Sequence, residues 1–200
     1  MLFRSDFQGT DSNGDPIDPV LDVGKKDLFV FRPNTAGDYS TGRFYMLLDE
    51  VASNFLTGVS LVEERTLVGD VWVEKGTFLI NQGNSLDIVL FDPTGPAGGV
   101  GVGADTQGTK TTLIAGDDIG LGNNSSKISG LDLIENDVTL GDMTLRSGNI
   151  LVTLTGSDTD TGNNNLVVTE NDVFYLEVFT AGNNTSAKDR KSTRLNSSHP

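Results

Sequence analysis

The chain contains no cysteine, and among its 200 residues it has a single histidine, His199. Without cysteine, neither a disulfide nor a thiolate metal site can stabilise the fold. His199 falls in a segment that is set aside below. The remaining sequence therefore excludes Ser-His-Asp catalysis, Cys-His catalysis and His-ligated zinc.

Positive charge and long apolar runs are also scarce. Lys and Arg total 14 against 28 Asp and Glu, a formal net charge of -14. Such a chain lacks the cations that displace counterions from nucleic acid or bind anionic membrane surfaces. No apolar run approaches the roughly 18 residues of a membrane helix. With 36% apolar residues and 24 glycines, the chain can still build packed β layers and should fold.

The C-terminal stretch DRKSTRLNSSH, Asp189 to His199, looks like the in-frame translation of a sequencing-library adapter. We therefore interpret residues 189–200 as a non-native tail and exclude them from fold reasoning. Without this tail, Lys plus Arg falls from 14 to 11 and Asp plus Glu from 28 to 27, a net charge of -16. An interrupted gene is a fragment, so we expect the natural protein to continue past both ends.

Two sequence echoes indicate a repeat protein. LVEERTLVGD, at Leu61 to Asp70, recurs 72 residues later as LIENDVTLGD, at Leu133 to Asp142, and each copy runs on into a similar β-type segment. The second echo has a spacing of 145 residues, about twice 72: Asp27, Phe29, Thr35, Ala36 and Gly37 recur as Asp172, Phe174, Thr180, Ala181 and Gly182. Periods of this length indicate stacked units rather than one closed domain.

Short β-type runs between turn signals, with no helical period, predict an all-β fold. We expect tandem antiparallel units of about four strands that resemble β-propeller blades. Tandem β-sandwiches are the alternative, although a sandwich usually needs about 100 residues. The expected segments are the end of a truncated preceding repeat (1–26), repeat unit 1 (27–86), repeat unit 2 (87–171), the start of unit 3 (172–188) and the tail (189–200).

Four local expectations follow from the same pattern. Gly69-Asp70, like Gly141-Asp142 in the second copy, should set the turn into the repeat hairpin at residues 71–80, and Lys75-Gly76 should be the turn of that hairpin. Trp72 occupies a strand position, which favours a place in the β core. Glu63 and Glu135 should face solvent.

The segments DLFVFRPNTAGDYSTGRFYMLLDE (27–50) and AGDDIGL (115–121) resemble tandem repeats of very large bacterial secreted or surface proteins. Those adhesin-like proteins often carry cadherin-like and calcium-binding (RTX-type) modules. The resemblance implies an extracellular or cell-surface location. It implies no assigned activity for the repeat itself.

The clearest metal candidate is the acidic loop before the first repeat. Asp11, Asn13, Asp15, Ile17 and Asp22 match loop positions 1, 3, 5, 7 and 12 of a calcium loop. However, Pro16 stands where such a loop needs glycine, and an acidic surface turn is the other interpretation. Asp158 and Asp160, expected on a hairpin tip, form a thinner calcium candidate. Calcium is the only cofactor that the sequence suggests.

The sequence predicts a non-enzymatic structural or adhesive repeat region with no catalytic residues. Its expected partners are neighbouring repeats of the same chain and cell-surface or matrix ligands, without nucleic acid or membrane insertion. The repeated carboxylate pairs Asp49-Glu50 and Asp117-Asp118 suggest a structural task more than catalysis. The alternative is a fragment of a β-propeller hydrolase or carbohydrate-binding domain whose site lies in missing blades, and the full reading frame would discriminate between the two.

Overall fold

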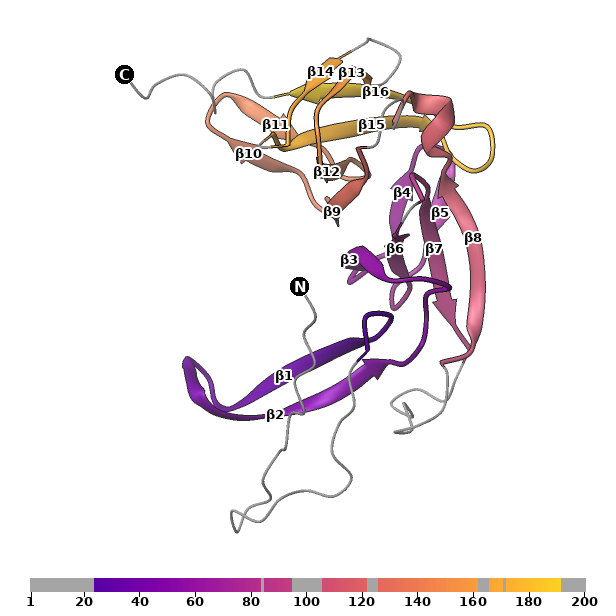
Figure 1. The fold of residues 1–200 in the computed structure, drawn as a ribbon. Helices are drawn as coiled ribbons and strands as arrows, with labels where there is room; N and C mark the ends of the chain where they lie inside the picture. The colour runs from indigo at the N-terminus through magenta and orange to yellow at the C-terminus, as the bar shows by residue number, and fades with distance from the viewer. Residues whose placement is uncertain are drawn as a thin grey trace. The chain divides into compact units, whose positions relative to one another are not determined.

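A computed structural model describes residues 24–83, 85–94, 106–121, 126–161, 166–170 and 172–191. This part of the chain confirms the all-β expectation, because it consists of β-strands and one short 3-10 helix, η1 (Gly116–Ile119) (Figure 1). The chain divides into two compact units. Unit 1 is Met1–Phe55 with Pro93–Gly108, and unit 2 is Leu56–Asp92 with Thr109–Pro200.

Unit 1 contains an antiparallel hairpin of β1 (Leu28–Thr35) and β2 (Asp38–Leu48). β1 continues through Pro33, which lies opposite Gly42. A two-stranded ribbon tolerates proline because each strand has an edge at which no amide donor is needed. After β2, the chain is held by a reciprocal pair of bonds: the Asp49 amide donates to Thr106 Oγ1, and the Thr106 amide donates to the Asp49 carbonyl, both at 2.8 Å.

Unit 2 contains two four-stranded antiparallel sheets. The first pairs β3 (Leu56–Leu61), β6 (Phe78–Gln82), β7 (Ile88–Pro93) and β8 (Gly108–Ile114) in that order. The second pairs β9 (Ile128–Leu133), β12 (Ile150–Leu154), β15 (Phe174–Thr180) and β16 (Ser186–Lys191). The first two strands of the second sheet lie 72 residues after those of the first. Each sheet is built from successive segments of the chain, as expected for blade-type units; a sandwich repeat would divide its strands between two sheets. Each sheet crosses an expected unit boundary, because β7 and β8 follow residue 87 and β15 and β16 follow residue 172. From here on, the first repeat means the segment that forms the first sheet, and the second repeat the segment that forms the second sheet.

Short hairpins interrupt both sheets after their first strand. β4 (Thr66–Val68) pairs with β5 (Val71–Val73), and β10 (Val138–Leu140) pairs with β11 (Met143–Leu145). Gly69-Asp70 is a turn, as expected, but it joins β4 to β5 instead of leading into a hairpin at residues 71–80. The expected hairpin around Lys75-Gly76 is wrong, because β5 pairs with β4 whereas β6 pairs with β3. The second repeat also carries an inserted hairpin of β13 (Asp158–Thr161) and β14 (Leu166–Val168).

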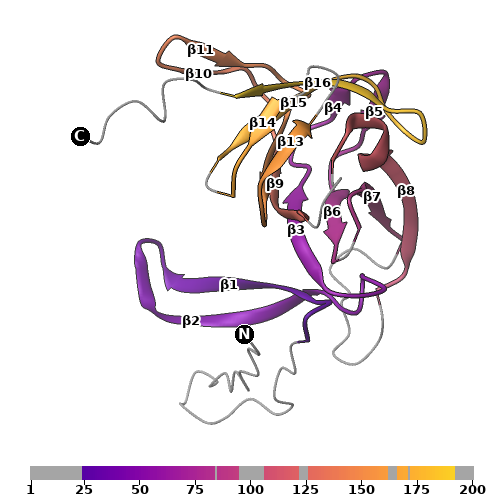
Figure 2. The same ribbon diagram turned by 45° about the horizontal axis from the view of Figure 1, so that its top comes forward.

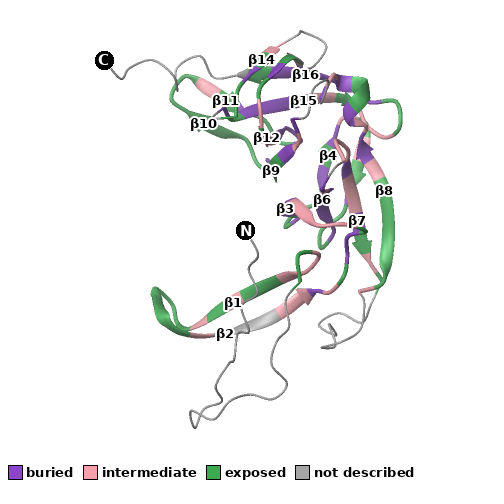
Figure 3. Cartoon of the chain, viewed as in Figure 1, coloured by how far each residue is buried: buried purple, intermediate pink, exposed green. Residues whose placement is uncertain are grey.

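One apolar core joins the two sheets of unit 2. Ile150, Val152 and Leu154 are at most 2% exposed and alternate along β12 with half-buried residues, which is the period of a strand with one core face. They belong to the same cluster as Leu79 and Ile88 of the first sheet. Strands of both sheets carry buried residues (Figure 3). The expectation for Trp72 is wrong: its side chain is 50% exposed and lies under the guanidinium of Arg65, 4.2 Å from the ring centroid.

Candidate functional site: the groove between the repeats

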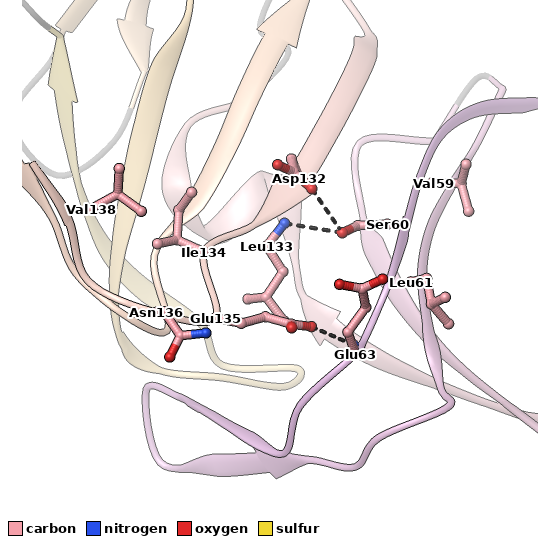
Figure 4. A pocket seen from close by; sticks show the side chains of 10 residues that line it. All are labelled: Val59, Ser60, Leu61, Glu63, Asp132, Leu133, Ile134, Glu135, Asn136 and Val138. Carbon is pink, nitrogen blue, oxygen red and sulfur yellow. Dashed lines mark hydrogen bonds between the residues drawn. The ribbon is translucent and has the colours of Figure 1, made fainter. Parts of the chain in front are cut away.

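The first strands of the two sheets, β3 and β9, lie side by side and define the contact between the repeats (Figure 2). Gly58 permits this close approach, because a Cβ there would lie 3.1 Å from the Leu131 side chain. A groove of about 500 Å³ opens along the contact (Figure 4). Its lining residues are Val59, Ser60, Leu61, Glu63, Asp132, Leu133, Ile134, Glu135, Asn136 and Val138.

Ser60 ties the two strands together from its buried position on β3. Its hydroxyl donates to Asp132 Oδ1 and accepts the Leu133 amide, both at 3.1 Å. Asp132 is the residue 72 positions after Ser60, so the bond joins equivalent places in consecutive repeats. The first repeat supplies a hydroxyl at this place and the second a carboxylate, which gives the pair a donor and an acceptor.

A second set of bonds, which we name the Glu135 clasp, closes one end of the groove. The half-buried Glu135 carboxylate accepts the amides of Glu63 at 2.5 Å and Glu64 at 3.0 Å. In addition, Asn136 Nδ2 donates to Glu64 Oε2 at 3.4 Å. The solvent-facing expectation therefore holds for the exposed Glu63, whereas the Glu135 carboxylate binds backbone of the preceding repeat. Bonds of this kind, to an ionised acceptor, are stronger than neutral ones.

A third contact joins the outer parts of the two repeats. The turn between β15 and β16 donates its amides to the first repeat: Ala181 to Asp70 Oδ1 at 2.8 Å, Gly182 to the carbonyl of Leu113 at 2.7 Å, and Thr185 to Asp118 Oδ2 at 2.9 Å. Asp118 belongs to one of the carboxylate pairs for which a structural task was expected. The bond from the Thr185 amide gives Asp118 that task, because its carboxylate oxygen holds the neighbouring repeat.

The structure places the predicted metal residues apart from the groove or does not describe them. Asp11, Asn13, Asp15, Ile17 and Asp22 lie outside the described residues. Among the residues that are described, no three Asp, Glu, His or Cys side chains gather in a group that could hold a metal ion. For calcium, the first candidate loop therefore stays a prediction.

Asp158 and Asp160 lie in strand β13 rather than on the expected hairpin tip. Asp158 is 5% exposed, and its Oδ2 accepts the Ser126 hydroxyl at 3.3 Å. The calcium prediction for this pair is not tested by these contacts.

Asp189 is the first residue of the stretch that the sequence analysis excludes as a non-native tail, yet it belongs to strand β16 (Ser186–Lys191). It lies on β16 opposite Leu176 and is 1% exposed, on the same side of the strand as buried Ala187. Burial, together with the negative charge of Asp158, raises the pKa of Asp189 to about 7. Strand alternation could have identified the position, because residues two apart share a face.

No family model, curated protein or solved structure matches the chain. In the described residues, no helix has the length and apolar character needed to cross a membrane. The fold and the groove define a class nevertheless. The chain is an all-β repeat protein in which equivalent residues of consecutive units are hydrogen-bonded to each other.

Proposed function

We propose that this chain is a non-enzymatic structural and adhesive repeat region of a large exported bacterial surface protein, stabilised by calcium. One observation carries the proposal: Ser60 bonds Asp132, and Glu135 bonds the amide of Glu63, each across 72 residues. Bonds between equivalent positions are what a stacked array needs, because each new unit can meet the previous one in the same way.

The mechanism is spacing and display. Consecutive sheets bury a common apolar core, and the clasp fixes their order, so a chain of such units holds its ends apart. The formal net charge of -14 opposes this compaction through self-repulsion. Divalent cations bound to acidic loops would reduce that repulsion, which gives calcium a structural part.

The groove gives less support to the alternative of a hydrolase or carbohydrate-binding domain. Asp132 accepts the Ser60 hydroxyl, and Glu135 accepts two backbone amides, so both carboxylates are engaged in joining the repeats. A glycosidase instead needs two carboxyl groups facing a scissile bond at a defined separation. None of the residues that line the groove is aromatic, so it offers no ring on which a sugar could stack.

Calorimetric melting in calcium and in EDTA tests the proposal. With free Ca²⁺ at about 100 times Kd, binding stabilises the folded state by about 2.7 kcal/mol. For a chain of this size, that corresponds to a Tm increase of about 5–10 °C. The coupled core also predicts that both sheets of unit 2 melt in one transition.

Mg²⁺ at equal ionic strength is the matched control, since it screens charge as Ca²⁺ does but demands a smaller, octahedral site. An unchanged Tm in EDTA would remove calcium from the proposal. Two separate transitions for the sheets of unit 2 would contradict the coupled array.

A further inference from the structure

The strand β10 exposes residues whose counterparts in the first repeat are buried. Thr66 and Val68 of β4 are 2% and 0% exposed, whereas Val138 and Leu140, 72 residues later, are 42% and 54% exposed. β4 is in contact with β15 of the following repeat. Leu140 therefore occupies the position equivalent to the core residue Val68, but no strand in the described part of the chain packs on it as β15 packs on β4.

The turn beside β10 differs from its counterpart in the same way. A Cβ on Gly69 would lie 3.0 Å from Val178 Cγ1, and the neighbouring Asp70 accepts the Ala181 amide. At Gly141, with nearly the same φ (61° against 60°), nothing lies within 4 Å of such a Cβ. We name this place, formed by Val138, Leu140, Gly141 and Asp142, the β10 corner.

The β1–β2 hairpin carries a second copy of the sequence that begins the turn at the first corner, in a shorter loop, since Thr35 pairs with Asp38 whereas Thr180 pairs with Ser186. Thr35-Ala36-Gly37 repeats Thr180-Ala181-Gly182, and the two glycines share a positive φ, 84° and 93°. Thr35, Ala36 and Gly37 are exposed, and nothing lies within 4 Å of a Cβ on Gly37. Further back on the same strand, Phe29 is 37% exposed although its counterpart Phe174 is 1% exposed.

We propose that the β10 corner binds the β1–β2 turn of a second copy of this chain. In this contact the Ala36 amide of the second copy donates to the Asp142 carboxylate, as the Ala181 amide donates to Asp70 at 2.8 Å within one chain. Leu140 and Val138 lie beneath the incoming turn. The inference extends the established contact between repeats from one chain to two and does not depend on calcium or on a surface location.

The contact joins two different surfaces, so it is heterologous. Each copy carries one corner and one turn, and a contact of this type continues from copy to copy unless the rotation closes a ring. The formal charge of -14 on each copy opposes association. Salt screens this repulsion, so association becomes tighter as the NaCl concentration rises.

Sedimentation velocity of the full chain tests the proposal across about a hundredfold range of concentration in the Kd region. The wild-type weight-average mass rises with concentration. Leu140→Glu on the corner and Ala36→Pro on the turn each weaken association about tenfold or more, the first by placing charge in the contact and the second by removing the amide donor. Val167→Glu changes an equally exposed valine (57%) on β14 and leaves association unchanged.

Mixing the two weakened variants gives the sharpest result. Leu140→Glu retains an intact turn and Ala36→Pro retains an intact corner, so the mixture forms heterodimers and nothing larger. Circular dichroism shows that each variant is folded. The proposal is overturned if the wild type stays monomeric at every concentration, if Leu140→Glu associates like the wild type, or if the mixture stays monomeric while the wild type associates.

Discussion

Replacing Asp189 with asparagine is expected to stabilise the protein at pH 8 by up to about 4 kcal/mol. The pKa of this carboxyl is raised from 3.8 to about 7, first by burial and then by the charge of Asp158. Each unit of this pKa difference corresponds to about 1.4 kcal/mol, and the total is the free energy by which ionised Asp189 destabilises the folded state. Asparagine has a similar volume and no charge to desolvate.

The sign of the pH dependence follows from proton binding. Between about pH 4 and pH 7 the folded state retains the Asp189 proton that the unfolded state has lost, so the contribution of Asp189 to stability falls as the pH rises. Urea unfolding of wild type and Asp189→Asn should therefore agree near pH 4 and diverge up to about pH 7. Above that pH the difference should stay constant.

Asp158→Asn provides the matched comparison. It removes the negative charge of Asp158 but leaves Asp189 buried. It should therefore lower the pKa of Asp189 by less than burial raises it. A difference between wild type and Asp189→Asn that is the same at pH 4 and pH 8 would show that Asp189 does not titrate in this range.

The second large effect is expected at Gly148, in the turn that follows β11. A Cβ there would lie well inside 3.0 Å of the Leu67 carbonyl oxygen on β4 of the preceding repeat. Its φ of 87° adds the strain of an L-residue in the left-handed region, about 1–2 kcal/mol. Overpacking against a neighbouring backbone adds about 1–3 kcal/mol, so Gly148→Ala should destabilise the protein by about 2–5 kcal/mol.

Gly76 is the control, because it occupies the same place in the first repeat. Its φ is 88°, but nothing lies within 4 Å of a Cβ built on it. Gly76→Ala should therefore show the strain alone, about 1–2 kcal/mol. Chemical denaturation of both variants measures the difference. Equal destabilisation would mean that the Leu67 carbonyl does not confine Gly148 in solution.

The repeat and its β class could be predicted from sequence because both are periodic. The 72-residue echo marks equivalent strands, and Gly69-Asp70 marks a turn whose chemistry is local. The error at Lys75-Gly76 has a nonlocal cause. Two β-type runs around a glycine turn indicate a hairpin, but β5 pairs with β4 and β6 pairs with β3. The sequence around the turn does not show that these two pairings are more stable than a β5–β6 hairpin.

The site was less predictable than the fold for the same reason. Glu135 reads as one more acidic surface residue until the two repeats are placed side by side and its carboxylate meets two amides. Trp72 reads as core, but it is half exposed and its ring lies against the Arg65 guanidinium. The adapter interpretation of residues 189–199 and the calcium sites stay predictions, as does the surface location.

Amide hydrogen exchange at Glu63 and Glu64 tests most directly whether equivalent residues join consecutive repeats. Both amides donate to Glu135, whereas the adjacent Val62 amide donates to the Thr77 carbonyl at 2.9 Å within its own repeat. In Glu135→Ala, exchange at Glu63 and Glu64 should accelerate about tenfold, the equivalent of one hydrogen bond, while Val62 keeps its protection. Unprotected exchange at Glu63 and Glu64 in the wild type, or equal acceleration at Val62, would contradict the account.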